Sequence, residues 1–266
     1  MSEKFARFCL KHKVLGRIIA FLMYAIPFTV IFYVFGAGVS AYVIAYCVIA
    51  VVTIFMTSAV PAVLTTPALK MLTDKCDPYP LLEACDEILQ YVKLPNEILT
   101  ATLNRCVALA FIGRHQENYD ILKSIAIDSY NGLPATIKYT YYNNLADAAL
   151  TLDDIETAEF AFAKSKECHS AIKNKKLYAQ YADANNFLQV VFCIKRGEFE
   201  SALALLKGVD TASVSRSVNV AYLYAKINIG LGKLERAKTD LEYVIATGNK
   251  LCCVEEAKRL LQEISQ

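Results

Sequence analysis

Charge is what this 266-residue sequence most clearly lacks: residues 18–69 contain no Asp, Glu, Lys or Arg. A soluble fold does not bury an uncharged stretch of 52 residues. A bilayer core needs about 20 apolar residues for each helical crossing, so this stretch is long enough for two. The string Gly36-Ala37-Gly38 lies near its middle and favours a turn. We predict a transmembrane helical hairpin over residues 15–69, with crossings at about 15–35 and 39–63 in the lipid bilayer.

Acidic residues are nearly absent before this stretch. Residues 1–69 contain five Lys or Arg and one acid, Glu3. Basic residues beside a membrane span stay preferentially on the cytoplasmic side, so we expect an integral cell-membrane protein with two passes and both termini cytoplasmic. Residues 1–14 form a basic cytoplasmic tail in this interpretation, placed to contact anionic lipid. A signal peptide cleaved near residues 39–41 is the alternative, and the second apolar segment that follows argues against it.

Neither a nucleic-acid partner nor a cofactor has a signature here. Residues 70–266 contain 23 Lys or Arg and 25 Asp or Glu, so no basic face is expected and nucleic acid is excluded as a partner. The nine cysteines are scattered and contain no C-x-x-C, so no disulfide framework or zinc site is expected. Thiols so dispersed are typical of a reducing compartment.

Catalytic motifs are also missing. There is no Gly-rich phosphate loop, no H-E-x-x-H and no G-x-S-x-G, and histidine occurs only three times. Cys168 and His169 are adjacent, but neighbouring residues on a helix do not face each other. We expect a protein that is not an enzyme and that has no cofactor, metal or catalytic residue.

Small residues recur every fourth position in the second crossing, a spacing that lets another helix approach closely. Packing within the hairpin explains this stripe most simply, and contact between two copies of the chain is the alternative. Its members are Ala37, Ala41, Ala45, Thr53 and Thr57.

Helices without strands are expected after the membrane segment. Residues 70–96 would hold a linker and an amphipathic helix at about 79–93, with Asp77 and Pro78 at its start. From residue 97 the chain is predicted to form pairs of helices. The turn within each pair has a recurring form, a turn residue followed five positions later by a small one, in 113–118 (GRHQEN), 153–158 (DDIETA), 197–202 (GEFESA) and 232–237 (GKLERA).

These turns resemble those of the tetratricopeptide repeat (TPR), a helix–turn–helix unit of 34 residues. The large residue that follows each turn also fits the family, and Asn118 departs from it because Ala is expected there. The resemblance implies an all-α fold, in which the hairpin is followed by an α-solenoid of degenerate TPR-like helical hairpins over residues 97–266. Residues 251–265 would be its capping helix.

In TPR proteins the first helices of the pairs line a concave groove, where asparagine often binds the backbone of a peptide. An amide can donate and accept together, which suits an extended chain. The alternative is that the asparagines bridge neighbouring helices. By the resemblance, the groove residues are Asn104, Asn143, Asn144, Asp147, Asn186, Phe187, Tyr222 and Lys226.

Together these patterns predict a membrane-anchored scaffold or adaptor that binds a protein or peptide partner at the membrane. A regulatory protein with a TPR-like sensor domain for a peptide or ligand is the alternative. Lys226 is the only basic residue in this set. The carboxylate clamp of chaperone-binding family members needs Lys or Arg in adjacent repeats, so binding of a chaperone C-terminus is disfavoured.

Overall fold

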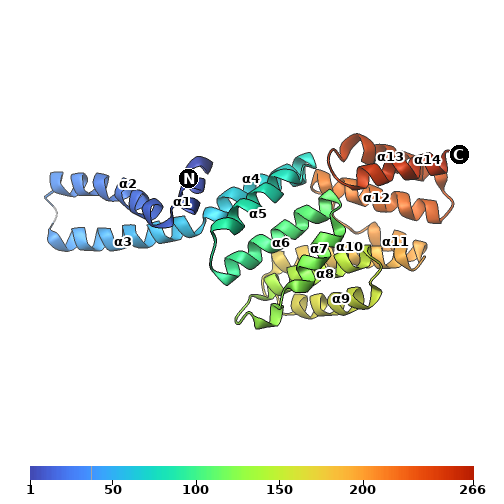
Figure 1. Ribbon diagram of the computed structural model, residues 1–266, viewed down its shortest axis with the longest axis horizontal. Coiled ribbons are helices and arrows are strands. Elements are labelled where there is room, and N and C mark those ends of the chain that lie inside the picture. Colours follow the sequence, from blue (N-terminus) through green and yellow to red (C-terminus); the bar gives the residue numbers. More distant parts are fainter. Residues whose placement is uncertain (37) are drawn as a thin grey trace.

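The computed structural model describes residues 1–36 and 38–266, and all regular structure in these residues is helical. Figure 1 shows an extended molecule with a helical hairpin at one end and a body of packed helices at the other. Ala37, which belongs to both the predicted turn and the predicted stripe, lies outside the described residues.

The helices follow one another with short connections. They are α1 (Glu3–Lys11), α2 (Lys13–Val34), α3 (Val39–Ser58), α4 (Val60–Lys75), α5 (Tyr79–Tyr91), α6 (Pro95–Ile112), α7 (His115–Ser124), η1 (Ile127–Ser129), α8 (Ala135–Thr151), α9 (Ile155–Ser170), α10 (Lys175–Lys195), α11 (Phe199–Leu206), α12 (Val214–Gly230), α13 (Leu234–Thr247) and α14 (Cys253–Ile264).

Two helical segments, Lys13–Val34 and Val39–Lys75, are long and apolar enough to cross a membrane. In each, only 17% of the most apolar window is buried, whereas a core helix of a soluble protein would be mostly buried. Helices α2 and α3 pack against each other, and Thr53 in the small-residue stripe is buried in the hairpin. Thr57 accepts a hydrogen bond from Arg17 of α2 at 3.4 Å. Contacts within the hairpin therefore explain the positions of Thr53 and Thr57, two members of the stripe.

The helical body begins earlier than the sequence suggested. Helix α4 starts at Val60, continues through the predicted boundary at residue 69 to Lys75, and packs on α1, α5 and α12. Val60 and Leu64 are buried against α1 and α5. Helix α4 is apolar because one of its faces is buried in the body. Composition alone does not distinguish such a helix from a membrane span.

The basic N-terminus is a helix rather than a free tail. Ser2 caps α1 through its hydroxyl, which accepts from the backbone N–H of Phe5. Ala6, Cys9 and Leu10 are buried against α4 and α5. Arg7 forms an ion pair with Glu87 of α5. Helix α1 therefore joins the hairpin to the body.

The four recurring turns share one backbone geometry. Gly113, Asp153, Gly197 and Gly232, which begin them, all have a positive φ, between 62° and 88°. In each turn the N–H of the next residue donates to the carbonyl of the residue five positions earlier, as Lys233 does to Asn228 at 2.8 Å. This is the Schellman ending of a helix, in which a left-handed residue satisfies the last carbonyls. The small residue five positions on is buried in every turn, Asn118 included.

The last helices return to the first ones of the body. Helix α12 packs on α4, and the loop before α14 contacts the corner between α4 and α5 (Figure 1). There Lys250 donates its backbone N–H to Cys76 and pairs with Asp77 at 2.6 Å. The Cys252 N–H donates to the Phe111 carbonyl of α6. Both ends of the body therefore meet.

Candidate functional site

A cavity of about 190 Å³ lies between the inner faces of α6, α8, α10 and α12, with one residue from α7. The first helix of each predicted pair therefore supplies part of its wall. It is lined by Cys106, Val107, Ala110, Phe111, Asn118, Asn143, Asn144, Asp147, Ala184, Phe187, Leu188 and Arg216.

Asp147 brings an uncompensated carboxylate to this cavity. It follows Asn143 and Asn144 by four and three positions, so all three lie on one face of α8. The surrounding protein removes water from the carboxyl group and raises its pKa to about 6. No charge or hydrogen bond in the described chain opposes this effect. A carboxylate so placed favours a cation as its neighbour.

Two amides of the cavity also have no partner. Asn118 is 3% exposed, and its side-chain oxygen forms no hydrogen bond within the described residues. The same holds for the side-chain nitrogen of Asn144. Buried polar side-chain atoms are nearly always hydrogen-bonded. Two unpaired atoms on residues that line one cavity therefore indicate a binding site for a ligand.

Helix α12 brings a positive charge to the lining, and Asp183 of α10 already compensates it. Arg216 pairs with Asp183 at 2.7 Å and lies over the ring of Phe187, 4.0 Å from its centre. The guanidinium is therefore held in place and its charge is compensated before any ligand arrives. Apolar side chains of α6 and α10 form the rest of the wall.

Half of the predicted groove residues meet in this cavity, namely Asn143, Asn144, Asp147 and Phe187. Asn143 has a structural partner as well, since its oxygen accepts from the Tyr139 hydroxyl at 3.2 Å. The same hydroxyl reaches the Asn185 side chain of α10 at 3.1 Å. The bond of Asn143 therefore lies within α8, and Tyr139 is the residue that contacts α10. The Asn144 nitrogen has no partner within the described residues.

The other predicted residues lie outside the cavity lining. Asn104 is half-buried on α6, and Asn186 is exposed on α10. Tyr222 and Lys226 form a separate cluster with Glu256 of α14, where Lys226 lies 3.9 Å from the Glu256 carboxylate. Burial and, next, Glu256 raise the pKa of Tyr222.

Asn118 and Arg216 are cavity residues that were not predicted. A signal for Asn118 was present, because it replaces the small residue expected in its turn. Arg216 lies near the start of α12, and its distance from the other residues in the sequence gives no such signal.

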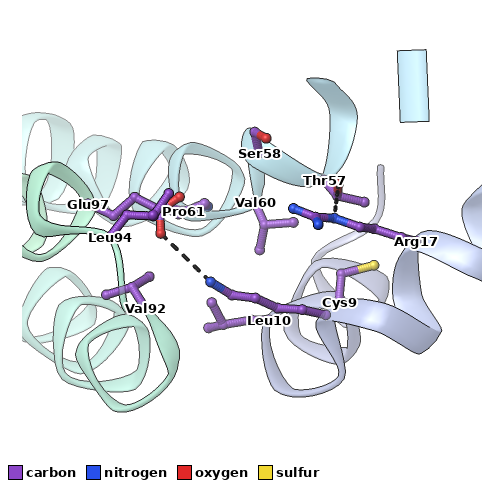
Figure 2. Close-up of a pocket in the computed structure, with 11 residues that line it drawn as sticks. Cys9, Leu10, Arg17, Thr57, Ser58, Val60, Pro61, Val92, Leu94 and Glu97 are labelled. Atoms are coloured by element: carbon purple, nitrogen blue, oxygen red, sulfur yellow. Dashed lines mark hydrogen bonds and ion pairs between the residues drawn. The ribbon is translucent and has the colours of Figure 1, made fainter. Parts of the chain in front are cut away.

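A smaller cavity, of about 70 Å³, lies where the hairpin joins the body, and Figure 2 shows its side chains. Its charged groups pair with protein atoms. Lys13 reaches Glu97 at 3.8 Å, and Arg17 reaches Thr57. These contacts connect α2 to the start of α6 and to the end of α3, so we assign this cavity a structural role.

Cys168 and His169 do not form a pair. The His169 Nε2 atom is bonded to the Tyr178 carbonyl at 2.8 Å, and its ring stacks on Tyr178. Burial raises the pKa of the Cys168 thiol, which disfavours the reactive thiolate. Across residues 1–36 and 38–266, no group of three or more His, Cys, Asp or Glu side chains is arranged to hold a metal ion.

The site described by these contacts is thus a concave, partly polar cavity whose lining residues include one uncompensated carboxylate and two amides with one unpaired atom each in the described chain. No protein-family model matches the chain, and neither curated proteins nor solved structures give a match to it.

Proposed function

We propose that this chain is a membrane-anchored scaffold or adaptor, in which a two-pass hairpin holds a TPR-like helical array at the cytoplasmic face. The observation that carries the proposal is the cavity on the inner faces of α6, α8, α10 and α12. It contains polar groups that the protein itself leaves unpaired. A partner segment would bind there.

The four turns support the TPR-like part of the proposal. They share the left-handed residue, the hydrogen bond that closes the helix and the buried small residue. A left-handed closing residue suits the tight turn between the two helices of each hairpin. In such a stack the first helices line the concave side, and the cavity lies on these helices.

The exposed apolar faces of α2 and α3 support the membrane part. Large side chains such as Met23, Tyr33 and Phe55 are 62–81% exposed, which in water would create an extensive apolar patch. A tether of this kind raises the effective concentration of a partner already in the membrane. The basic residues at the start of the chain favour a cytoplasmic body.

The test is photo-crosslinking in intact membranes. Phe187 is replaced by p-benzoylphenylalanine, and the matched control carries the same residue at Phe160, an exposed aromatic of α9. We expect one protein to be crosslinked from position 187, to copurify in stoichiometric amount, and to be absent from the control at 160. Equal adducts from both positions, or none from 187, would contradict the proposal.

The sensor alternative draws support from the size of the cavity. At about 190 Å³ it is smaller than the roughly 300–1,000 Å³ typical of sites for drug-sized ligands, and it suits one small group. A sensor would be stabilised against heat by its ligand alone, without a protein partner.

A further inference from the structure

The unpaired groups of the cavity define the chemistry of what binds there. They comprise two acceptors, the Asp147 carboxylate and the Asn118 oxygen, and one donor, the Asn144 nitrogen. All three lie in the lining of the same cavity. A ligand that satisfies all three must bring hydrogen-bond donors for Asp147 and Asn118, an acceptor for Asn144, and a positive charge.

Other ligand classes fit less well. An anion would be repelled by Asp147, and Arg216 is not free to attract it because Asp183 already pairs with that guanidinium at 2.7 Å. A neutral amide would satisfy Asn118 and Asn144 but would leave the carboxylate without a counter-charge. A primary ammonium has three donors and compensates the charge.

The walls favour an aliphatic stem behind the ammonium. Val107, Ala110, Phe111 and Leu188 give the cavity an apolar lining beside its polar groups. Lysine has the matching form, since its methylene chain packs on apolar surface while its head stays polar. The carbonyl of the same residue would be an acceptor for Asn144.

We propose that this cavity binds a primary ammonium group on an aliphatic stem, with Asp147 as its counter-charge and Asn118 as a second acceptor. The ammonium comes either from a lysine side chain or from a free alkyl amine. This inference deepens the proposed function, on which it rests for the lysine source, because it names the group by which a partner segment enters the groove.

Ligand-observed NMR titrations of the full chain in detergent at pH 8 and constant ionic strength test this. The probes are n-butylammonium chloride and n-butanol, which has the same stem and no charge. We expect saturable binding of n-butylammonium, at least tenfold weaker binding of n-butanol, and at least a tenfold loss for n-butylammonium in D147N. The matched control is D128N, which neutralises an exposed carboxylate in η1 outside the cavity and is expected to bind like the unaltered chain.

A second variant keeps the test independent of how D147N folds. Asn118→Leu preserves the approximate shape and removes the buried acceptor, and we expect binding to weaken several-fold. Circular dichroism of both variants reports whether they remain helical. A lysine source predicts tighter binding of N-acetyl-lysine methylamide than of n-butylammonium, whereas a free amine predicts the opposite order.

Three results would overturn the inference: no saturable binding to the unaltered chain, as for a cavity that holds only water; equal affinity in D147N; or equal binding of n-butanol. These failures are distinct from failure of the scaffold. A partner crosslinked at 187 without amine binding would retain the scaffold and reject the ammonium. Amine binding without a crosslinked partner would retain the ammonium site and reject the scaffold.

Discussion

The Asp147 carboxyl group lies in surroundings that oppose its charge. It loses water on folding and gains no charge or hydrogen bond in the described chain to compensate, which is why its pKa rises to about 6 from an ordinary 3.8. Groups whose environment opposes their charge are concentrated at functional sites, because stability and function place different demands on a residue.

The pH dependence of stability follows from this shift. Because the pKa of the folded state is the higher one, the folded chain binds the proton more tightly between pH 4 and 6. The contribution of this group to the free energy of unfolding therefore falls as pH rises through that window and is constant above it. A shift from 3.8 to about 6 corresponds to about 3 kcal/mol, so Asp147→Asn should raise the free energy of unfolding at pH 8 by up to that amount and by much less at pH 4.

Thermal denaturation at pH 8 and pH 4 checks this prediction. The control is Asp128→Asn, which alters an exposed carboxylate and should change the stability at neither pH. A variant equally stabilised at pH 4 and pH 8 would show that the effect arises from packing and not from charge.

How far the sequence predicts the site depends on the residue. Asn144 and Asp147 could be found because they lie on one face of a helix that the turn pattern had already positioned. Asn118 had a weaker signal, since a polar residue in place of the small one marks the position but not the cavity that it lines. Arg216 required the tertiary structure, because the contact of α12 with α10 brings it to Phe187.

Among the elements, the four turns follow from local chemistry most directly. Glycine is favoured where φ is positive, because any side chain there is strained, and three of the four turns contain it. The fourth has Asp153, whose short polar side chain tolerates the left-handed region better than most.

Two of these glycines give a matched prediction. A Cβ at Gly232 would meet no atom within 4 Å, so Gly232→Ala should cost only the backbone strain, about 1–2 kcal/mol. A Cβ at Gly113 would lie 2.9 Å from the Cys252 Cβ, so Gly113→Ala should cost more.

Chemical denaturation of each variant, with Gly208→Ala as the control at a glycine of ordinary φ, measures the difference. Equal losses at 113 and 232 would mean that the loop before α14 moves freely away from Gly113.

Element boundaries at the end of the apolar hairpin were the least predictable part. Helix α4 is as uncharged as α3 up to residue 69, yet it lies in the body. Its position depends on contacts with helices distant in the sequence, α1 and α12. Hydropathy does not predict such contacts. Helix α1 also has a partner distant in the sequence, because its Arg7 pairs with Glu87 of α5.

At the scale of the whole molecule, the contacts of α4 indicate where the chain can be divided. A fragment of residues 59–266 retains α4, whereas 70–266 removes Val60, Leu64 and Ala68, all buried. We expect 59–266 to be the more helical by circular dichroism and to unfold at a higher temperature. If the shorter fragment is equally stable, α4 is dispensable to the body.

The topology in the membrane has a simple check. A reporter fused after Gln266 should be active on the cytoplasmic side, because the basic residues precede α2 and an even number of crossings returns the chain to the same side. Activity on the outer side would reverse the proposed orientation.

The contact between the two ends of the body has a further consequence for how it unfolds. In an open stack of repeats the terminal units have one neighbour and fray first. Here the Lys250–Asp77 and Cys252–Phe111 contacts give the last helices a second neighbour at the start of the body. Amide hydrogen exchange in α13 and α14 should therefore be as slow as in the middle helices, so that the body opens as one cooperative unit and not from its end.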